Sequence, residues 1–539
     1  MVPAGLEGFG REWRTTMSIL KLVLGLVPII WLIIALSGLK MPGFKACPIA
    51  IIFAAVVAIA YKHMEIPHVA TAIVEGVCMA LWPILLVIIA ALFVYALVQE
   101  TGAMDKIKAM LTSVSVDKRV LAIIIGWGFG CFMEGMAGFG TAVAIPAAIM
   151  VGMGFDPIPT VISLLIVNTT PTAFGSVGVP TTSLGTASGL DVMMLSANTV
   201  NIQLVLQLIT PFLMVIVIGG GVKALKGMIP FTLLASLSFS IPNFIMAHFA
   251  GSELPDIVGS IICMIVCIVY AAKFMQGDVP EEYKVGKGGQ KLDLTVSEGV
   301  KAWAPFILIF ILLLLTSKLV PFISQPLSVF KSSIKIYNGI EYYDPSADPG
   351  MASFAWINTP GIWIILSGII GGLIQGASIG QIFGVLGKTI KNNVKTILTI
   401  CSVLATARIM VHSGMTRDVA DVLVQITGSF YPLFAPLVGV LGAFVTGSGT
   451  STGILFGSLQ SAAATQIGAA PGWLCAANSF GAGVGKMIAP SNVALACASA
   501  GLAGKESKIM SQSIKWVVAF VILGGIITFV GPMIGIVVM

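Results

Sequence analysis

The sequence predicts an all-α, polytopic membrane protein. Of its 539 residues, 57% are hydrophobic and only 10% are charged, whereas soluble domains carry about 25% charged residues. The mean hydropathy is +1.01, and apolar runs of about 20 residues, each long enough to cross a hydrocarbon core of roughly 30 Å, recur from end to end. A large soluble protein with buried helices would need polar helix faces, which these runs lack.

Apolar segments divide the chain into about 12–14 expected transmembrane helices. Two shorter apolar pieces rich in Gly, Ala, Ser and Thr, residues 134–154 and 447–468, are expected to form re-entrant hairpins. The candidate spans are residues 17–38, 43–61, 77–98, 119–133, 158–175, 197–220, 228–249, 254–273, 303–320, 360–376, 392–412, 430–446, 472–488 and 512–538.

Polar character is concentrated in two stretches, residues 274–300 and 321–359. Either stretch can hold a small soluble excursion, and the first can also link two halves of the protein. We therefore expect an N-terminal membrane half over residues 1–273, a polar linker loop over 274–300 and a C-terminal membrane half over 301–539.

An internal repeat relates the two halves. In the first half Asn168 is followed twelve residues later by Pro180, and in the second half Asn478 is followed twelve residues later by Pro490. A small-residue turn precedes each pair, GFGTA in the first half and GSGTST in the second. The joint spacing of turn, apolar piece, Asn and Pro indicates a duplication.

Each repeat is expected to combine one hairpin with one broken helix, at residues 158–180 and 472–490. Unpaired backbone at membrane depth is tolerated only where it is buried in protein or lines a cavity. Interrupted segments at matching positions of two halves are the best sequence pointer to a transporter's substrate site. The sequence therefore predicts two inverted-topology repeats whose interruptions meet at a binding site.

The expected site suits a small carboxylate. Broken helix ends expose N–H groups and a partial positive charge, which favour an anion, and nearby hydroxyl and amide groups, Thr172 among them, can bind the ligand's oxygens. The simpler interpretation is that Ser, Thr and Gly only allow helices to pack closely, but the paired clusters favour a site. The candidate substrate-binding residues are Gly138, Phe139, Gly140, Asn168, Thr169, Thr170, Ser448, Thr450, Ser451, Asn478, Ser479 and Lys486.

Two ionisable residues within this apolar sequence are functional candidates, because a charge at the bilayer centre costs about 2.5–3.5 kcal/mol on insertion scales. Glu134 is the candidate proton carrier, since burial favours the neutral form of a carboxyl group and lets it gain and lose a proton near neutral pH. A static ion pair is the alternative role for Glu134. Lys486 can act as the counter-charge of an anionic substrate or as the partner of Glu134.

Four further ionisable residues lie in or near apolar segments. Arg408 and His412 stand one turn apart in the span 392–412. They can join the transport pathway or, near the end of their span, reach the membrane interface. Glu75 and Asp156 are expected at helix ends, where they would face water or lipid headgroups.

Composition and spacing argue against other classes of function. The four histidines are not grouped with acids at metal-ligand spacing, so we expect no metal, no cofactor and no enzymatic activity. The eight cysteines lie in apolar stretches and are expected to be free thiols. The net charge of +6 is scattered over loops, which indicates contact with membrane lipids and no nucleic-acid partner. Nothing in the sequence indicates an oligomeric state.

At EGMAGFG, NTTPTAFGSVGVP and TGSGTST…GVGKMIAP the chain resembles the L-lactate permease family. The resemblance extends from LWPILLVIIAALFVY, at residues 81–95, to LAGKES, at residues 502–507. It implies a secondary transporter that imports L-lactate, glycolate and related 2-hydroxymonocarboxylates with protons across the bacterial inner membrane. It also implies kinship with ion transporters built from two inverted repeats with re-entrant hairpins.

The family's motifs fall on the residues already singled out. Its Glu-Gly-x-x-Gly-Phe-Gly pattern matches Glu134 to Gly140, its Val-Asn-Thr pattern matches Val167 to Thr169, and its Gly-Lys-Met-Ile pattern matches Gly485 to Ile488. The resemblance therefore assigns the same three segments to the site as the repeat does.

The chain departs from the family's usual residues in two regions. His412 follows Val411 where the family has Asn-Tyr, and Arg408 replaces an apolar residue. Ser491 and Asn492 stand where Pro-Gln is usual. These departures bear on the exact substrate more than on the class of transport.

A sodium-coupled transporter of another small carboxylate is the nearest alternative. Carbonyl groups of broken helices, together with Asn and Thr, can coordinate Na⁺ as readily as they frame a substrate. The proton is the expected coupling ion, and sodium stays the alternative. A membrane-embedded enzyme lacks grouped acids and histidines, and the paired broken repeats favour alternating access over an open channel.

Overall fold

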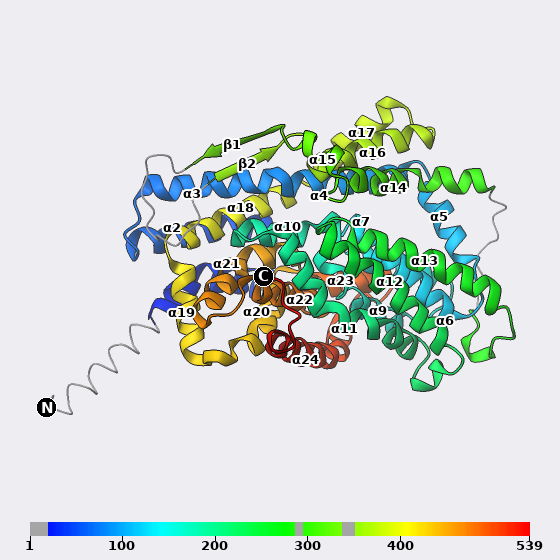
Figure 1. Cartoon of the computed structure of the whole chain (residues 1–539). Coiled ribbons are helices and arrows are strands. Elements are labelled where there is room, and N and C mark those ends of the chain that lie inside the picture. Colours follow the sequence, from blue (N-terminus) through cyan, green and yellow to red (C-terminus); the bar gives the residue numbers. More distant parts are fainter. Residues whose placement is uncertain (1–19, 139, 286–294, 337–350) are drawn as a thin grey trace.

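The computed structural model describes residues 20–138, 140–285, 295–336 and 351–539, which are mostly helical (Figure 1). The first half contains the helices Leu20–Leu36, α2 (Gly43–Ala60), α3 (Ile66–Met79), η2 (Ala80–Leu85), α4 (Leu86–Glu100), α5 (Ala103–Thr112), α6 (Lys118–Leu121), η3 (Ala122–Phe129), α7 (Gly130–Met136), α8 (Thr141–Gly152), α9 (Pro157–Val167), η4 (Pro171–Phe174), α10 (Gly175–Ser188), α11 (Val192–Ile218), α12 (Ile229–Phe249) and α13 (Pro255–Phe274).

The second half continues with a further set of helices and one short β-hairpin. These elements are α14 (Val296–Thr316), α15 (Pro321–Leu327), β1 (Lys331–Lys335), β2 (Met351–Ala355), α16 (Pro360–Ile374), α17 (Ile379–Asn392), α18 (Val394–His412), α19 (Met415–Thr427), α20 (Tyr431–Thr446), α21 (Gly449–Ile467), α22 (Pro471–Gly485), α23 (Pro490–Ser499) and α24 (Glu506–Val530).

Ten helices of the described chain are long and apolar enough to cross a membrane, or eleven if a bent pair counts as one span. That pair is Pro157–Val167 and Pro171–Ser188, which meet at 60°. This confirms the predicted helical, multi-pass class, with fewer spans than the 12–14 expected. Hydropathy does not show where a helix stops, and the candidate spans 360–376 and 472–488 form helices of only 15 residues each.

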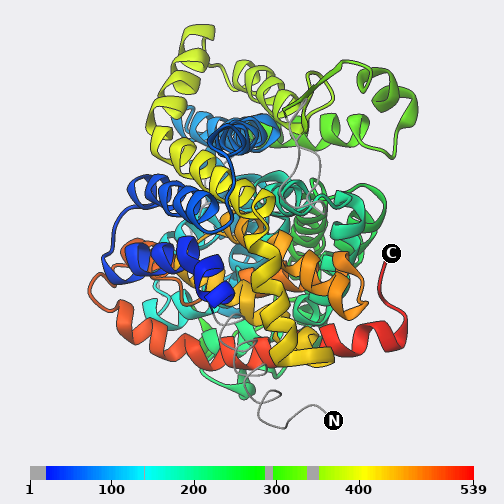
Figure 2. The same cartoon turned by 90° about the vertical axis from the view of Figure 1, so that its left-hand side faces the viewer.

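The helices stack in layers. Figures 1 and 2 both place α24 along the bottom edge of the molecule and the α16–α17 pair at its top. The centre is occupied by two buried segments: residues 119–136 are buried throughout, and so is α22 from Gly472 to Gly485. The first segment holds Glu134, and Lys486 directly follows the second, so both residues lie in the buried interior of the helical body.

Glycines let α22 lie directly against α20. A Cβ added at Gly481 would collide with the carbonyl oxygen of Pro436, and one at Gly485 would collide with that of Val440. In membranes, where helix association depends on close van der Waals packing, small residues at the contact bring backbones together. The same contact fixes the end of α22 and therefore the position of Lys486.

One element departs from the all-α expectation. Strands β1 and β2 pair antiparallel, with Lys331 opposite Ala355, within the stretch 321–359 that the sequence marks as polar. The hairpin lies over α3 (Figure 1), and Trp82 Nε1 anchors it by donating to Ala355 O at 3.0 Å.

The predicted linker is anchored where it is described. Lys284 forms an antiparallel bridge with Asp117, and the Arg119 guanidinium lies 4.0 Å from the ring centroid of Tyr283. Residues 286–294 lie outside the described part of the chain. The division into two halves at this segment stays a prediction.

The cysteines are free, as expected. Most of them are buried, whereas Cys78 and Cys401 are half-buried. Cys263 and Cys267 face each other on α13 with their Sγ atoms 3.8 Å apart. They stand one helical turn apart and act as small apolar side chains of the core.

Candidate functional site

A small polar cavity lies where interrupted segments of the two halves meet. Its volume is about 220 Å³, below the roughly 300–1,000 Å³ of pockets for drug-sized ligands, so it suits a ligand of few heavy atoms. Its wall comes from the turn between α7 and α8, α10, the turn between α20 and α21, and the break between α22 and α23. The lining residues are Glu134, Gly138, Gly140, Thr172, Gly175, Ser176, Pro180, Thr446, Gly447, Ser448, Gly449, Thr450, Lys486 and Asn492.

Left-handed backbone shapes the first-half wall. Gly138 and Gly140 have φ values of 61° and 83°, and a Cβ at Gly138 would collide with Ser176 Oγ. Ser176 and Val177 have φ values of 47° and 56° and precede Gly178 at 77°. A β-branched residue in this region is strained, and such strain persists only where the surrounding structure enforces it, often at functional sites.

The two breaks stand at the same offset in the predicted repeat. Ser176 stands eight residues after Asn168, and Lys486 stands eight residues after Asn478. Helix α22 runs unbroken to Gly485, and α23 begins at Pro490. Ser176 and Lys486 both line the cavity, although the inverted topology of the repeats stays a prediction.

Glu134 and Lys486 form a buried ion pair in the cavity wall. Lys486 Nζ donates to Glu134 Oε1 at 2.7 Å, and the two side chains are 7% and 3% exposed. Asn168 bridges the pair: with its amide oriented so that both atoms are paired, Nδ2 donates to Glu134 Oε2 and Oδ1 accepts from Lys486 Nζ, each at 3.2 Å. Of the two roles open to Lys486, the structure shows the partner of Glu134.

Gly175 makes room for this pair. A Cβ at Gly175 would lie 3.1 Å from Glu134 Oε1 and 3.1 Å from Glu134 Cγ. Its backbone, at φ −63° and ψ 158°, is open to any residue, so the constraint is the space beside Glu134. Glycine at this position therefore keeps the carboxylate of Glu134 next to the cavity.

The start of α21 supplies a second feature that favours an anion. Ser448 Oγ accepts from the backbone N–H of Ser451 at 3.2 Å and caps the helix. Ser448, Gly449 and Thr450 all line the cavity. The first-turn N–H groups of a helix carry partial positive charge, so this helix start and Lys486 act on the same space.

Three polar lining residues were not among the predicted ones. Ser176 Oγ donates to Ala137 O at 2.8 Å, Thr446 Oγ1 donates to Ser448 O at 3.1 Å, and Asn492 Nδ2 donates to Gly447 O at 3.3 Å. These bonds hold the irregular backbone of the breaks. The sequence signal that could have identified these three residues is their position, because each lies close to a glycine turn or a proline of the predicted repeat.

Of the predicted substrate-binding residues, Gly138, Gly140, Ser448, Thr450 and Lys486 line the cavity, and Asn168 joins it through the ion pair. Other predicted residues face elsewhere. Thr169 Oγ1, in the turn after α9, donates to Ile166 O of that helix at 2.7 Å, and Thr170 Oγ1 lies 3.4 Å from Thr210 Oγ1. The described lining also lacks Ser451, Asn478 and Ser479. Phe139 lies outside the described residues.

Arg408, His412 and Glu75 form a separate buried cluster, which bears on two expectations. Arg408 Nη2 lies 2.5 Å from Glu75 Oε1, and His412 Nε2 lies 2.7 Å from Glu75 Oε2. All three side chains are at most 3% exposed. Glu75 was expected at a helix end facing water or lipid headgroups, and this is wrong, because α3 continues through η2 into α4 and carries Glu75 inside, opposite α18. Of the two alternatives for Arg408 and His412, their burial contradicts the membrane interface, and a place on the transport pathway stays a prediction.

Asp156, by contrast, lies at a helix end as predicted. Its Oδ1 accepts from the backbone N–H of Ile158 at 3.0 Å and caps α9. Such a cap satisfies one of the orphan donors of the first turn.

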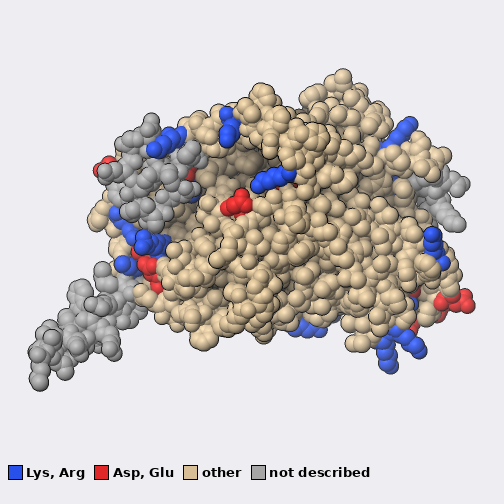
Figure 3. Space-filling model, viewed as in Figure 1, with Lys and Arg blue, Asp and Glu red and all other residues tan. Residues whose placement is uncertain are grey.

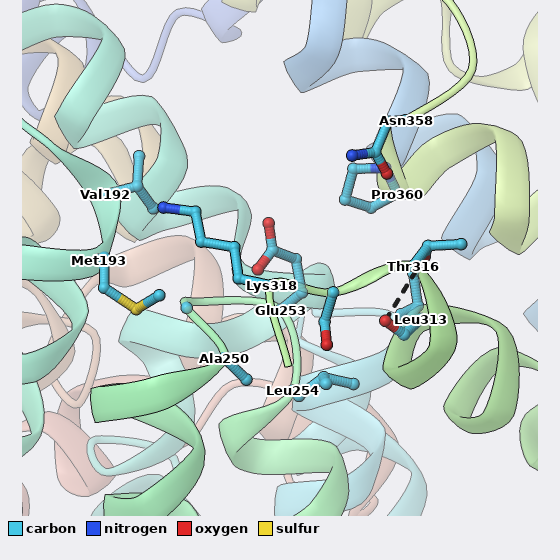
Figure 4. A pocket seen from close by; sticks show the side chains of 12 residues that line it. Val192, Met193, Ala250, Glu253, Leu254, Leu313, Thr316, Lys318, Asn358 and Pro360 are labelled. Carbon is cyan, nitrogen blue, oxygen red and sulfur yellow. Dashed lines mark hydrogen bonds between the residues drawn. The ribbon is translucent and has the colours of Figure 1, made fainter. Parts of the chain in front are cut away.

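A second, outer cavity lies between the loop before α13, the end of α14 and the start of α16. Its lining includes Glu253, Lys318 and Asn358, and Figure 4 shows the side chains of Lys318 and Glu253 projecting into it. Figure 3 shows this face of the molecule hollowed, with basic and acidic side chains at the hollow. Burial raises the pKa of Glu253 above its ordinary value, and the charge of Lys318 opposes the rise.

A neighbouring cavity is also lined by Glu253 and Asn358, and it reaches the broken segment at the start of α10. Its lining includes Val177, Val179 and Thr182, whereas Ser176 and Pro180 line the central cavity. The strained segment of α10 therefore separates the outer cavities from the ion pair.

Together, the many apolar spans and a small charged cavity inside them define a membrane transporter. The L-lactate permease family model matches residues 21–535 of the chain. The chain is 40% identical to an L-lactate permease of Streptococcus iniae over 84% of this chain and 93% of that protein. It is 32% identical to the glycolate permease GlcA of Escherichia coli K12, over 94% and 95%. The chain belongs to the L-lactate permease family and is thus a permease, not an enzyme.

Two solved structures resemble the chain weakly. One is MtrF of Neisseria gonorrhoeae, described with a class of antimetabolite efflux pumps, at a TM-score of 0.42 and 12% identity over 82% of this chain and 80% of that one. The other is the YdaH transporter of Alcanivorax borkumensis, at a TM-score of 0.43 and 11% identity over 83% and 85%. At these scores neither bears on the arrangement of the site.

Proposed function

We propose that the protein imports L-lactate, glycolate and related small 2-hydroxymonocarboxylates by proton symport across the bacterial inner membrane. The names of its relatives, L-lactate permease and glycolate permease, support the substrate class. The observation that carries the proposal is the buried ion pair of Glu134 and Lys486 beside a cavity of about 220 Å³.

Charge balance supports coupling to a proton. The pair is neutral as it stands, and a monocarboxylate entering alone would add an unpaired negative charge to a buried site, which costs several kcal/mol. If a proton enters with the anion, Glu134 becomes neutral and the anion pairs with Lys486. The site then carries the same net charge before and after loading.

The geometry suggests how the exchange proceeds. A proton that binds to Glu134 Oε1 removes the acceptor of the 2.7 Å bond from Lys486 Nζ. Lys486 is then free to donate to the substrate carboxylate, assisted by the start of α21. Asn168, which contacts both members of the pair, can hold the freed Glu134 side chain or the substrate hydroxyl.

Release follows the reverse order. When Glu134 loses its proton, its carboxylate competes with the substrate for Lys486 and displaces it. The anion and the proton therefore leave together, and neither ion leaks alone through a site whose charge must balance.

Uptake of labelled L-lactate into proteoliposomes under an imposed pH gradient, with and without sodium, tests this function. We expect accumulation driven by an inside-alkaline gradient and unaffected by sodium, with glycolate competing and acetate competing less because it lacks the hydroxyl. Accumulation that depends on sodium and not on the pH gradient would instead establish the sodium-coupled alternative.

A further inference from the structure

A second carboxyl group is buried beside the ion pair. Asp256, in the first turn of α13, is only 1% exposed. A Cβ added at Gly135, the residue after Glu134, would lie 2.9 Å from Asp256 Cβ. The backbone of α7 that carries Glu134 therefore packs directly on Asp256.

Asp256 ends a chain of buried amides that crosses three helices. Gln207 Nε2 of α11 donates to Asn243 Oδ1 of α12 at 2.9 Å, and Asn243 Nδ2 donates to Asp256 Oδ1 at 2.9 Å. Helices α12 and α13 lie side by side (Figure 1). Asp256 Oδ2 is buried and has no hydrogen-bond partner among the described residues. One oxygen of this carboxyl group accepts a hydrogen bond from a neutral amide, and the other accepts none from the described residues.

No cation compensates Asp256 within the described chain. Of the elements packed against α13, η3 and η4 carry no titratable side chain, and α7 contributes Glu134 and the thiol of Cys131. Helix α12 contributes His248, which is bonded to Asn201. Helix α13 itself carries the thiols of Cys263 and Cys267, Tyr270 and Lys273, which stands in its last turn at the opposite end from Asp256, and the acid Glu253 precedes the helix. Lys486, the cation of this region, is paired with Glu134.

The energies favour a neutral Asp256. The first turn of a helix stabilises a negative charge by only about 0.3–1 kcal/mol. An unpaired buried charge costs several kcal/mol, and the bare oxygen of a neutral carboxyl costs about 1–3 kcal/mol as an unmade hydrogen bond. The carboxylate of Glu134 on the adjacent α7 further disfavours the charged form of Asp256, because a like charge nearby opposes ionisation.

We propose that Asp256 is a second proton-binding site, holding a resident proton whose retention depends on the charge of Glu134. The inference stands on the packing of α7 on α13, the one-sided hydrogen bonding of Asp256 and the count of two acids to one cation. It does not require the proposed substrate.

The resident proton has a consequence for loading the central site. Transfer of this proton from Asp256 Oδ2 to Glu134 breaks one O–H bond and forms another, leaves Asp256 as the carboxylate and frees Lys486. The net charge of the three groups is unchanged by the transfer. Asp256 is thus a store from which Glu134 can be protonated without a proton arriving from water at that moment.

Infrared spectroscopy of the whole protein in lipid membranes tests this inference. We expect the protein labelled with ¹³C at the aspartate carboxyl carbon to show an isotope-shifted carboxylic-acid C=O band at neutral pH. In Asp256→Asn the band should disappear. In Asp256→Glu the carboxylic-acid band should lose its isotope shift, because only aspartate is labelled. Asp156→Asn, which alters an aspartate outside this cluster and keeps a capping residue, should leave the band unchanged.

The coupling to Glu134 is tested by titrating the same band. In Glu134→Gln the negative neighbour is gone and Lys486 keeps an unpaired positive charge, so Asp256 should lose its proton at a pH lower by about one unit or more. Absence of a protonated-aspartate band from the labelled, unmutated protein at neutral pH would overturn the resident proton, whatever the variants do. An unchanged titration in Glu134→Gln would overturn the coupling. Neither result depends on transport, so the proposed function can fail separately.

Discussion

Glu134 and Lys486 are 352 residues apart in the sequence and meet at 2.7 Å. Glu134 lies in the last turn of the buried helix α7, and Lys486 stands at the break that follows the buried helix α22. Their contact therefore ties together the two halves at the cavity. Any movement that changes access to this cavity must keep, exchange or break this ion pair.

Replacing Glu134 by Gln should abolish accumulation of L-lactate against its gradient. The amide cannot carry a proton, so the driving force is lost, while Lys486 can still bind the anion and exchange can continue in part. Proton-driven uptake and counterflow in proteoliposomes separate the two activities. Asp156→Asn is the matched control, because Asp156 caps α9 away from the cavity. Accumulation that persists in Glu134→Gln would remove Glu134 as the proton carrier.

Replacing Lys486 by Met should weaken substrate binding about 10- to 100-fold. A hydrogen bond to a charged group contributes about 1.5–3 kcal/mol, and each 1.36 kcal/mol is a tenfold change. The apparent affinity for L-lactate in counterflow measures this loss, with the exposed Lys505 changed to Met as the control. Unchanged affinity would show that Lys486 does not contact the substrate.

Gly175→Ala should lower uptake while leaving the fold intact. The backbone at Gly175 accepts alanine, but the new Cβ would lie 3.1 Å from Glu134 Oε1 and Cγ, which displaces the carboxylate from Lys486. Gly152→Ala is the control, since a Cβ there meets nothing within 4 Å. Initial uptake rate and thermal stability, measured together, check this prediction. Equal rates in both variants would contradict a tight fit beside Glu134.

Glu75→Gln should destabilise the protein by roughly 3–5 kcal/mol, because it removes the carboxylate that compensates Arg408 in a buried cluster. A double variant that also changes Arg408 to Met should recover part of the loss, since no unbalanced charge then stays buried. Thermal unfolding in lipid nanodiscs measures both variants. If Glu75→Gln unfolds at the wild-type temperature, the cluster contributes little to stability.

Glu253 should make the protein less stable as pH rises, which is the opposite of the usual effect of an acidic residue. Burial raises its pKa above the ordinary 4.5, so the folded state binds the proton more tightly than the unfolded state. The stability it contributes is fully present below pH 4.5 and is lost as pH rises through the raised pKa. The unfolding temperature of Glu253→Gln, relative to the wild type, should therefore increase as pH rises from 4.5. A constant difference over that range would contradict the raised pKa of this carboxyl.

The sequence predicts the helical membrane class and much of the cavity, because both depend on local patterns. Long apolar runs identify spans, and an acid or a base inside such a run is costly enough to mark a site. Glu134 and Lys486 were found this way. Their pairing was left open, since no local pattern reports a contact between segments 352 residues apart.

The predicted repeat misplaced the helix break at Asn478, which does not line the cavity. The prediction placed a break beside both Asn168 and Asn478. In the first half the helix does end at Asn168, whereas α22 continues for two further turns to Gly485. Glycine contacts with α20 hold α22 as a regular helix through Asn478, and these contacts are tertiary and invisible in the spacing.

Glu75 shows the complementary error. A carboxylate near the edge of an apolar window is usually placed in water, but the partners that bury Glu75 lie on α18, more than 300 residues later. Strands β1 and β2 were missed for a related reason, because each has only five residues and is defined by pairing with the other. In both cases long-range contact overrides the local signal.

The exchange of partners at Lys486 is tested most directly by recording proton entry together with L-lactate entry. Proteoliposomes with a pH dye inside and the membrane potential clamped are given an inward L-lactate gradient, with protein-free liposomes as the reference. The lumen should acidify faster in wild-type vesicles than in the reference, and in Glu134→Gln it should acidify no faster than the reference. Carrier-mediated L-lactate entry without acidification, or equal acidification in Glu134→Gln, would contradict the account.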